Sequence, residues 1–487
     1  MRTRITLLFL LLCMSQLSAQ TDFEAYKQQQ QQQQFNAYSK QQKEDFEAYR
    51  TKLNAEYAEY MRKAWTKFSS NAAKPVPSRP EPPRPVVKKT DEKPEYRTLP
   101  MGKVVSPVTP TKPILPAVPL PEVKPATAAF PFMYYGTPCS VSLTDAHKYR
   151  LQGTSEEQVA DAWTLLSDDK YLPLLAECSN YRKKLNLCDW GYVRLIQVMT
   201  DSFFSTTNHN EAVLLQMYLL VQSGYKVRIA RTDNRLVLLL PIEQEVYNYS
   251  YLTIDGTPYY IMDDNSRGKS FYVYNRSFPQ ERGLSLYIAS VPNLKVKNGV
   301  QRTLTDGKLT KVAVTVNQNL IDFYDDYPRN AQWNFYSTAS LSSKAKSALY
   351  PKLRQAIEGK SKAEAANVLL HFVQNAFEYQ TDDVQFGVER PLFADEMLYY
   401  PYCDCEDRSI FYSILVRDLL GLDVVLLNYP HHLATAVRFV DEIAGDHIIL
   451  SGKKYTICDP TYIGASIGEA MPNCRNEQAT IIKIDFR

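Results

Sequence analysis

The sequence predicts an α+β protein in which two similar globular units follow a long, non-globular N-terminal region. Tyrosine is unusually common among the 487 residues, with 34 copies, and this content favours β-structure over a helical bundle. Helical and strand patterns alternate through most of the chain after a proline-rich segment. Because such a segment cannot form a packed core, it predicts a spacer that is followed by folded domains.

The first residues are typical of an export signal. Two arginines precede an apolar run from Ile5 to Leu12, and Ala19 is a small residue at the expected cleavage point. The run is too short to cross a bilayer. We therefore expect residues 1–19 to be a signal peptide, and the mature protein to be secreted or periplasmic without a transmembrane segment.

The charge pattern excludes a nucleic-acid-binding class, because acidic and basic residues are interspersed and the formal net charge is only +3. An odd number of cysteines follows the predicted leader: Cys139, Cys178, Cys188, Cys403, Cys405, Cys458 and Cys474. In an oxidising compartment this leaves at least one thiol unpaired within the chain. A catalytic thiol is one explanation for the odd count, and chance is the other.

Residues 20–70 are polar, include a run of seven glutamines and repeat a pair of aromatic residues. The pairs are Phe23/Tyr26, Phe35/Tyr38, Phe46/Tyr49 and Tyr57/Tyr60, and Phe68 falls one step further on. Their spacing of about 11 residues places them on one stripe of a helix, as in a coiled coil. We expect this helix either to pack on the chain's own globular part or to mediate self-association or docking.

Residues 71–128 form the predicted spacer. Fifteen of the 29 prolines fall between Pro75 and Pro125, in strings such as PVPSRPEPPRPVV. Proline fixes φ and removes a backbone donor, so the segment should be extended and semi-rigid. We expect the folded part to begin near Phe130.

Apolar periodicity and turn residues predict the main elements of the folded part. Helices are expected at Glu156–Leu166, Trp190–Phe204, Glu211–Ser223, Ser343–Glu358, Lys362–Phe377 and Ser409–Leu420. Strands are expected at Lys226–Ala230, Leu236–Leu240, Val312–Val316, Val424–Leu427, Leu433–Val440, His447–Leu450 and Tyr455–Cys458. Hairpin turns are expected at Asp255-Gly256 and Ser451-Gly452.

An internal duplication divides the folded part into two domains. SGYKVRIARTDNRLVLLLP (223–241) aligns without gaps to LGLDVVLLNYPHHLATAVR (420–438). The alignment pairs three positions of the two copies: Asn208 with Cys405, Arg235 with His432 and, after a one-residue shift, Asp263 with Asp459. We therefore expect a degenerate domain at 129–300, without the thiol and the imidazole, and a second domain at 301–487.

The segment YCDCEDRSIFY (402–412) carries two cysteines one residue apart, and this spacing allows several chemistries. Cys403, Cys405, Cys458 and a histidine, His431 or His432, are suitable metal ligands, but structural zinc usually uses cysteines separated by two to four residues. A disulfide between the two cysteines would close a very small ring. The remaining alternative is one nucleophile beside a bystander thiol, with no metal or other cofactor.

Cys405 has the better position for a nucleophile. Asp404 can cap a helix that begins at Cys405, and the helix dipole would then favour the thiolate. Helix-end stabilisation is only about 0.3–1 kcal/mol, and the neighbouring acids oppose a thiolate. A nearby imidazolium must therefore supply the rest. We expect Arg408 to pair with one of these acids.

His432 and Asp459 complete a candidate triad. His432 opens one predicted strand and Asp459 ends the next hairpin, so antiparallel neighbours can place the two side by side. The helix that packs across the sheet would bring Cys405 to the other side of the imidazole. In this order, Cys405, His432 and Asp459 supply nucleophile, general base and acid, and orienting carboxylate.

DCEDRS (404–409), PHHLATAV (430–437) and YTICDPTY (455–462) together resemble the transglutaminase-like superfamily of papain-type cysteine enzymes, in its bacterial secreted members. The resemblance covers roughly residue 345 to the C-terminus and, more weakly, 181–264. It implies two tandem papain-like domains, with the cysteine helix against an antiparallel sheet. It also implies the roles given above for Cys405, His432 and Asp459.

The chain departs from the family pattern, because Cys403 stands where members usually have glycine, Ala434 stands where tryptophan is common, and no acidic loop is typical of a calcium site. Hydrolysis of amide or peptide bonds is therefore at least as well supported as cross-linking. We expect an exported acyl-transfer enzyme that acts on a protein or peptide through a thioester, with Gln385 as a candidate oxyanion donor. The alternative is a non-catalytic scaffold that binds peptide or glycan.

Overall fold

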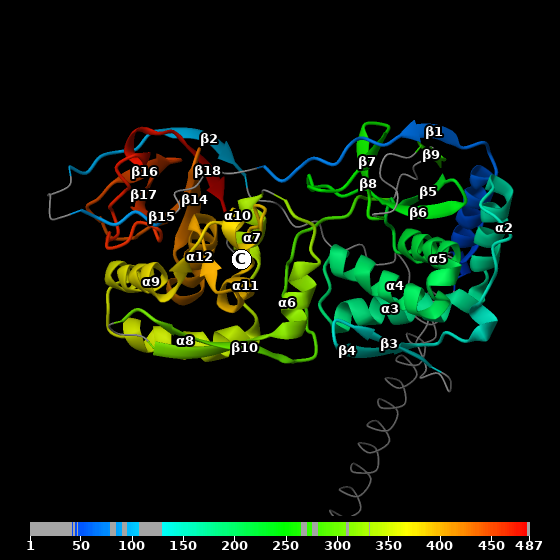
Figure 1. Ribbon diagram of the computed structural model, residues 1–487, viewed down its shortest axis with the longest axis horizontal. Coiled ribbons are helices and arrows are strands. Elements are labelled where there is room, and N and C mark those ends of the chain that lie inside the picture. Colours follow the sequence, from blue (N-terminus) through cyan, green and yellow to red (C-terminus); the bar gives the residue numbers. More distant parts are fainter. Residues whose placement is uncertain are drawn as a thin grey trace, which may run out of the picture.

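The computed structural model describes residues 47–77, 84–89, 95–106, 129–263, 270–274, 281–307, 311–330 and 332–484, together with 41, 44 and 45. Its mixed architecture of helices and two six-stranded sheets confirms the predicted α+β class. Figure 1 shows the sheets in two units that lie side by side. The first unit contains most of the described chain up to residue 297, and the second contains residues 298–484 and one strand from the N-terminal region. The predicted leader lies outside the described residues.

The first unit begins with a hairpin and a layer of helices that then lead into its sheet. The hairpin is β3 (Phe130–Tyr134) and β4 (Thr137–Val141), and the helices are α2 (Glu156–Leu166), α3 (Leu172–Lys184), α4 (Asp189–Phe204) and α5 (His209–Gln222). The sheet contains β5 (Arg228–Thr232), β6 (Arg235–Leu240), β7 (Tyr251–Ile254), β8 (Thr257–Ile261) and β9 (Ser270–Val273).

The second unit repeats this plan. Its hairpin is β10 (Asn298–Thr305) and β11 (Lys311–Asn317), and its helices are α6 (Gln318–Asp325), α7 (Trp333–Thr338), α8 (Ser343–Ile357), α9 (Lys362–Ala376), α10 (Asp382–Gln385), α11 (Ala394–Tyr399) and α12 (Cys405–Leu420). Its sheet contains β14 (Asp423–Tyr429), β15 (His432–Arg438), β16 (His447–Leu450), β17 (Lys453–Cys458) and β18 (Ala479–Lys483). A short parallel pair, β12 (Glu378–Tyr379) and β13 (Tyr402–Cys403), precedes α12.

The two sheets share one strand order. The first runs β7-β8-β6-β5-β9-β1 and the second β16-β17-β15-β14-β18-β2, so each strand has a counterpart at the same place. Helix α5 packs on β6 in the first unit, and α12 packs on β14 and β15 in the second. This is the relation expected of a duplicated unit. The predicted division after residue 300 falls inside β10.

Both predicted hairpin turns are confirmed. Asp255 and Gly256 have φ of 47° and 75°, and they join β7 to β8. Ser451 and Gly452 have φ of 51° and 74°, and they join β16 to β17. Two successive left-handed residues match the twist of the flanking strands in a two-residue hairpin loop.

The N-terminal helix is shorter than the sequence suggested. Residues 47–61 are helical, but β1 (Thr66–Ser69) follows as an edge strand of the first sheet. Phe68 therefore leaves the aromatic stripe and lies opposite Phe271 on β9. Eleven-residue spacing alone does not distinguish a continuous helix from a helix that is followed by a strand.

The described part of this helix packs on the chain's own first unit. The ring of Tyr57 stacks on Trp163, with ring centroids 4.6 Å apart. Its hydroxyl lies 3.1 Å from the Tyr274 hydroxyl and accepts a hydrogen bond from buried Arg228. Tyr49, two turns earlier, is exposed. Of the two expectations for the helix, packing on the globular part therefore holds at Tyr57.

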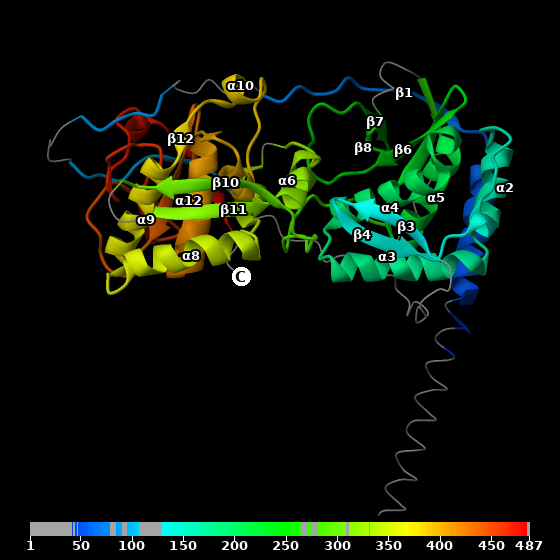
Figure 2. The same cartoon turned by 60° about the horizontal axis from the view of Figure 1, so that its bottom comes forward.

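The described parts of the proline-rich segment, residues 71–77, 84–89 and 95–106, form what we call the N-terminal strap. Figures 1 and 2 show it passing from β1 on the first unit towards the second unit. There β2 (Met101–Val105) runs parallel to β18, and Leu99 is buried in the core behind the sheet. The segment that was expected to be a spacer therefore also supplies a strand to a folded domain.

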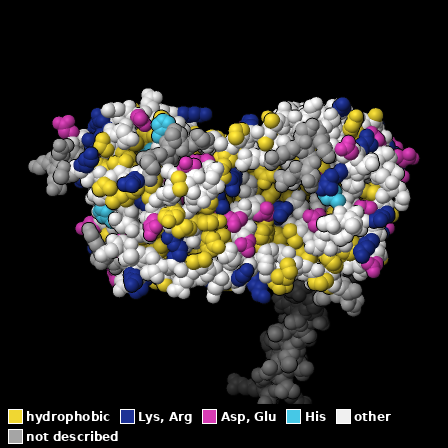
Figure 3. Space-filling view, in the orientation of Figure 1, with side chains coloured by type: hydrophobic (Ala, Val, Ile, Leu, Met, Phe, Trp, Pro, Cys, Tyr) yellow, Lys and Arg dark blue, Asp and Glu magenta, His cyan; other side chains and the backbone are white. Residues whose placement is uncertain are grey.

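Two surface features bear on the class of partner. Acidic and basic side chains are mixed over the face in Figure 3, as the near-neutral charge predicts. Among the helices of the described residues, none is both long and apolar enough to cross a membrane.

Replacing Tyr57 by alanine should destabilise the first unit by about 3–5 kcal/mol, because it removes a large aromatic side chain from a packed core. Tyr49→Ala is the matched control, and its effect should stay within about 0.5 kcal/mol because Tyr49 is exposed. Urea unfolding of the full chain measures both changes. Equal losses in the two variants would contradict the docking of the helix.

Candidate active site

Cys405 is the first residue of α12, and Asp404 is its N-cap residue, as predicted. The side chain of Cys405 is completely buried. The helix ends at Leu420, and Gly421, with a φ of 66°, is its left-handed C-cap. The thiol therefore lies at the positive end of a helix dipole, beneath the surface of the unit.

His432 and Asp459 meet at one end of the second sheet. His432 is the first residue of β15, and Asp459 directly follows β17, the antiparallel neighbour of β15. Both side chains are buried, and the distance from His432 Nε2 to Asp459 Oδ2 is 2.8 Å. When Nε2 donates its proton to this carboxylate, Nδ1 is the nitrogen that can accept a proton.

The other oxygen of the Asp459 carboxylate is held by the backbone. Asp459 Oδ1 accepts hydrogen bonds from the amides of Thr461 at 2.9 Å and Tyr462 at 3.2 Å. This arrangement fixes the rotamer of the carboxylate that contacts His432. The position of His432 therefore depends on the conformation of the loop that follows β17.

Cys405 approaches the same place from the helix. Its Sγ accepts a hydrogen bond from the amide of Leu433, the residue after His432, over 3.4 Å. The carbonyl of Leu433 in turn accepts from the Ser409 hydroxyl at 2.7 Å. The thiol also lies 3.2 Å from Glu406 Oε2, to which it can donate. The structure thus brings His432 and Asp459 into contact and places Cys405 against the neighbouring residue of β15.

Gln374 on α9 is a residue that the sequence analysis missed. It is buried, and its Nε2 donates to the carbonyls of Asp459 at 3.2 Å, Tyr462 at 2.8 Å and Ala465 at 3.0 Å. Its Oε1 accepts from the amide of Gly464 at 3.2 Å. The only feature of the sequence that could have indicated this role is the polar side chain of Gln374 on the apolar face of the predicted helix 362–377.

Two expectations for polar residues near the thiol are wrong. Arg408 does not pair with the acids beside Cys405, because its guanidinium donates to the carbonyls of Phe377 at 2.8 Å and Gln374 at 3.3 Å. Gln385 is not an oxyanion donor in this arrangement, because its amide pairs with the backbone of Tyr402 through both the nitrogen and the oxygen. Both side chains instead form hydrogen bonds with backbone groups of nearby segments.

The other cysteines are thiols in packed surroundings. All seven cysteines of the described residues are unpaired as disulfides. Cys403 is buried and points to the carbonyl of Glu378, and burial raises the pKa of its thiol to about 11. Burial also raises the pKa of Cys458 to about 12. These environments favour the protonated thiol, so neither residue has the features of a reactive cysteine.

Three carboxylates lie close together beside Cys405. Oxygen atoms of Asp382, Glu389 and Glu406 fall within 4.8 Å of one another. Hard cations such as magnesium and calcium take oxygen ligands of this kind, so these are the residues that could hold a metal. No sequence motif predicts this group, because its members come from α10, from the loop after it and from α12.

The first unit carries a different pair at the corresponding place. Arg235 at the start of β6 donates to Asp263 Oδ2 at 2.7 Å, where the second unit has His432 and Asp459. His209, the first residue of α5, lies 3.0 Å from the carbonyl of Leu236 through its Nε2. The Leu236 amide donates to Asn210 Oδ1 at 2.9 Å, whereas the Leu433 amide of the second unit donates to Cys405 Sγ. The pairing of Asn208 with Cys405 stays a prediction, and none of Asn208, His209 and Asn210 supplies a thiol.

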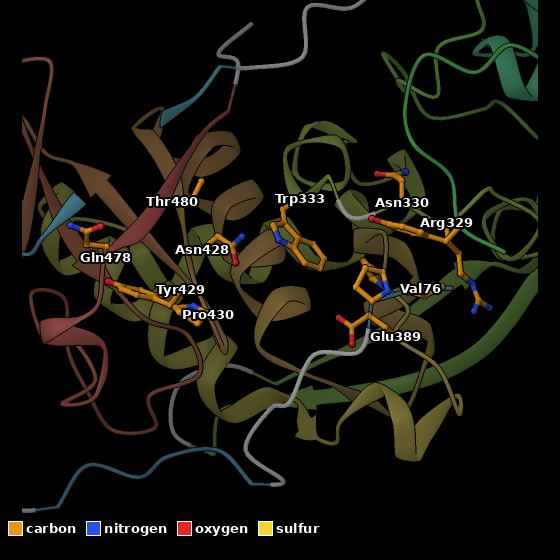
Figure 4. A pocket seen from close by; sticks show the side chains of 13 residues that line it. Val76, Arg329, Asn330, Trp333, Glu389, Asn428, Tyr429, Pro430, Gln478 and Thr480 are labelled. Carbon is orange, nitrogen blue, oxygen red and sulfur yellow. The ribbon is translucent and has the colours of Figure 1, made fainter. Parts of the chain in front are cut away.

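A cleft of about 420 Å³ opens beside the candidate triad. Its lining includes Trp333 on α7, the strand end Asn428-Tyr429-Pro430, Glu389, and Val76 of the strap (Figure 4). Trp333 also belongs to the cluster of buried side chains that contains Cys405 and Leu433. The thiol is therefore separated from the cleft by packed side chains of its own unit.

The chain matches no known family model, and neither a characterised protein nor a solved structure is significantly similar to it.

Ionisation of Asp407, on the first turn of α12, should make the free energy of unfolding depend on pH. Burial and the neighbouring Glu406 carboxylate raise the pKa of Asp407 from 3.8 to about 8. The folded state therefore binds one proton more than the unfolded chain between these values, and stability falls as the pH rises through this window. The slope from one such proton is at most about 1.4 kcal/mol per pH unit.

In Asp407→Asn this slope should become shallower by up to that amount, because the amide cannot ionise. Part of the slope should remain, because burial raises the pKa of Asp395 to about 6 and that of Glu396 to about 7. The amide can still accept the hydrogen bond from the Leu392 amide. Urea unfolding at pH 5, 6, 7 and 8 measures the difference. Asp383→Asn, at an exposed position on α10, is the control and should keep the wild-type slope. An unchanged slope in Asp407→Asn would assign the titration to another group.

Proposed function

We propose that the protein is an exported, cysteine-dependent acyl-transfer enzyme of the transglutaminase-like kind, which acts on amide or peptide bonds through a thioester. The observation that carries the proposal is the buried contact of 2.8 Å between His432 Nε2 and Asp459 Oδ2. Cys405 lies against the next residue of the same strand, at the start of α12. Nucleophile, base and orienting carboxylate thus come from three elements that one sheet holds together.

In the proposed reaction, the thiol of Cys405 transfers its proton to Nδ1 of His432, and Sγ attacks the carbonyl carbon of the substrate. The amides at the start of α12 stabilise the negative charge that develops on the carbonyl oxygen. His432 then protonates the departing amine as the C–N bond breaks, which leaves a thioester on Cys405. Attack by water releases an acid, and attack by an amine forms a new amide.

Glu406 opposes the first step. Its carboxylate lies 3.2 Å from Sγ, so it accepts a hydrogen bond from the neutral thiol and repels a thiolate. The helix dipole alone offsets too little of this repulsion, because it contributes about 0.3–1 kcal/mol at an exposed helix end. An imidazolium held by Asp459 supplies the larger compensation. The triad therefore requires His432 to have an orienting partner.

The cleft beside the triad suits a peptide or protein segment. Trp333, Tyr429 and Pro430 offer apolar contacts, and Asn428 and Asn330 add polar side chains to the lining. Figure 4 shows Trp333 between the Asn428–Pro430 side of the cleft and the Glu389 side. Because Trp333 packs in the same cluster as Cys405, substrate must rearrange this wall to reach the thiol.

Export and family membership are parts of the same proposal. The leader predicted at residues 1–19 supports a secreted or periplasmic protein. The shared strand order supports two tandem transglutaminase-like domains, of which the first is degenerate because Arg235 replaces the imidazole. An arginine at this place cannot act as a base, because its guanidinium stays protonated.

A second function is supported by the burial of the thiol. Cys405 has no exposed surface, and its sulfur contacts Glu406 and the Leu433 amide. These features also fit a scaffold that retains the triad as a packed group and binds peptide or glycan in the cleft. The two functions differ in whether Cys405 turns over a substrate.

Labelling with iodoacetamide and mass mapping should identify Cys405 as the most reactive thiol of the native protein. Cys405→Ala should abolish this labelling, whereas Cys403→Ala should preserve it. His432→Ala should slow the labelling of Cys405 at pH 7 at least tenfold, because the thiolate loses its counter-charge. Release of amine from a panel of peptides then tests turnover.

Labelling that survives in Cys405→Ala but vanishes in Cys403→Ala would contradict the assignment. A reactive Cys405 without turnover on any peptide would favour the scaffold.

A further inference from the structure

We propose that the N-terminal strap is a positioning element for Asp459, so that the active site of the second unit includes a segment from the other end of the chain. The inference rests on the proposed function, because it assigns the strap a part in orienting His432. The residues involved are Val86 and Lys88 of the strap and Ile463 of the loop that follows Asp459.

The strap pairs directly with this loop. The amide of Ile463 donates to the carbonyl of Val86 at 2.9 Å, and the amide of Lys88 donates to the carbonyl of Ile463 at 3.0 Å. These two bonds form a parallel bridge between Val87 and Ile463. The loop therefore receives backbone hydrogen bonds of the kind that join strands, although it belongs to no sheet.

A salt bridge extends the contact along the loop. Lys88 Nζ lies 2.7 Å from Glu469 Oε1, and both side chains are mostly buried. The other carboxylate oxygen of Glu469 accepts from the amide of Ser466 at 2.8 Å. Lys88 thus holds the loop at two points, through its amide at Ile463 and through its ammonium group at Glu469.

Gln374 holds the same loop from the opposite side. Its amide group binds the carbonyls of Asp459, Tyr462 and Ala465, and it accepts from Gly464. Ile463 lies within this stretch, and both its amide and its carbonyl pair with the strap. The backbone from 459 to 465 is therefore held between a helix of its own unit and the strap.

Two hydrogen bonds connect the held loop to the contact between His432 and Asp459. Asp459 Oδ1 accepts from the amides of Thr461 and Tyr462, which immediately precede Ile463. A shift of Ile463 would move these donors and rotate the carboxylate. The Oδ2 atom would then leave its position 2.8 Å from His432 Nε2.

The strap has its own anchors and does not depend on Ile463 for its position. The amide of Leu99 donates to the carbonyl of His447 at 2.8 Å, and the amide of Arg97 donates to Asp446 Oδ1 at 3.2 Å. Asp446 is buried and pairs with Arg475 at 2.8 Å. Beyond these contacts, β2 runs beside β18. The strap can therefore fix the loop against the sheet.

A pair of proline substitutions in the full-length protein tests the proposal. Lys88→Pro removes the amide that donates to Ile463 and also the ammonium group. Val87→Pro is the matched control, because Val87 is 61% exposed and its amide is not a donor in the bridge to Ile463. Lys88→Ala removes the ammonium group alone, and it serves as a milder variant if the proline variant does not fold.

Two measurements apply to each variant. In hydrogen–deuterium exchange, the amides of 461–467 should exchange at least tenfold faster in Lys88→Pro than in Val87→Pro. In alkylation by iodoacetamide at pH 7, the rate at Cys405 should fall at least fivefold in Lys88→Pro and stay within twofold of wild type in Val87→Pro. Lys88→Ala should lie between these two results.

Combination with Asp459→Asn separates positioning from a general loss of structure. If the strap acts through Asp459, Lys88→Pro should slow alkylation in the wild-type background but cause no further loss in the Asp459→Asn background. Equal rates in Lys88→Pro and Val87→Pro, or an additive loss with Asp459→Asn, would overturn the strap proposal. An alkylation rate that His432→Ala leaves unchanged would instead overturn the proposed function and, with it, the strap's catalytic part.

Discussion

The buried carboxylate of Asp459 is the group on which the geometry of the second unit depends. A buried charge is costly unless hydrogen bonds and an opposite charge compensate it. Asp459 obtains this compensation from His432 and from the amides of Thr461 and Tyr462. Gln374 and the strap both form hydrogen bonds to the loop that carries those amides. The helical layer, the sheet and the N-terminal segment therefore all contribute to one contact.

The two units have the same strand order but carry different side chains at the corresponding site. At the start of β6 and β15 the sheets present Arg235 and His432, and each side chain is bound to an aspartate that follows its neighbouring strand. In both units, a side-chain N–H group donates to the carboxylate. Only the imidazole can exchange a proton near neutral pH, because arginine stays charged. One residue type thus separates a structural ion pair from a pair suited to catalysis.

Local features of the fold were predictable, and long-range ones were not. The two-residue hairpins and the start of α12 at Cys405 follow from residue types that dictate backbone conformation within a few positions. The pairing of β2 with β18 does not, because an edge strand carries little pattern and proline suggested an isolated spacer. At the site, the positions of His432 and Asp459 at the ends of neighbouring antiparallel strands predicted that the two side chains meet. Arg408 and Gln385 were assigned wrongly, because their partners are backbone carbonyls and amides that no sequence pattern reveals.

The pairing of β2 with β18 also affects how the protein folds. The strap is synthesised early, whereas its partner strand lies at positions 479–483. Closing so long a loop costs entropy, and contacts between distant positions slow folding. The second sheet therefore gains its last strand only after nearly all the described chain has been made. Until β18 has been made, β2 has no partner strand, whereas the hydrogen bonds of the strap to Asp446, His447 and Ile463 can already form.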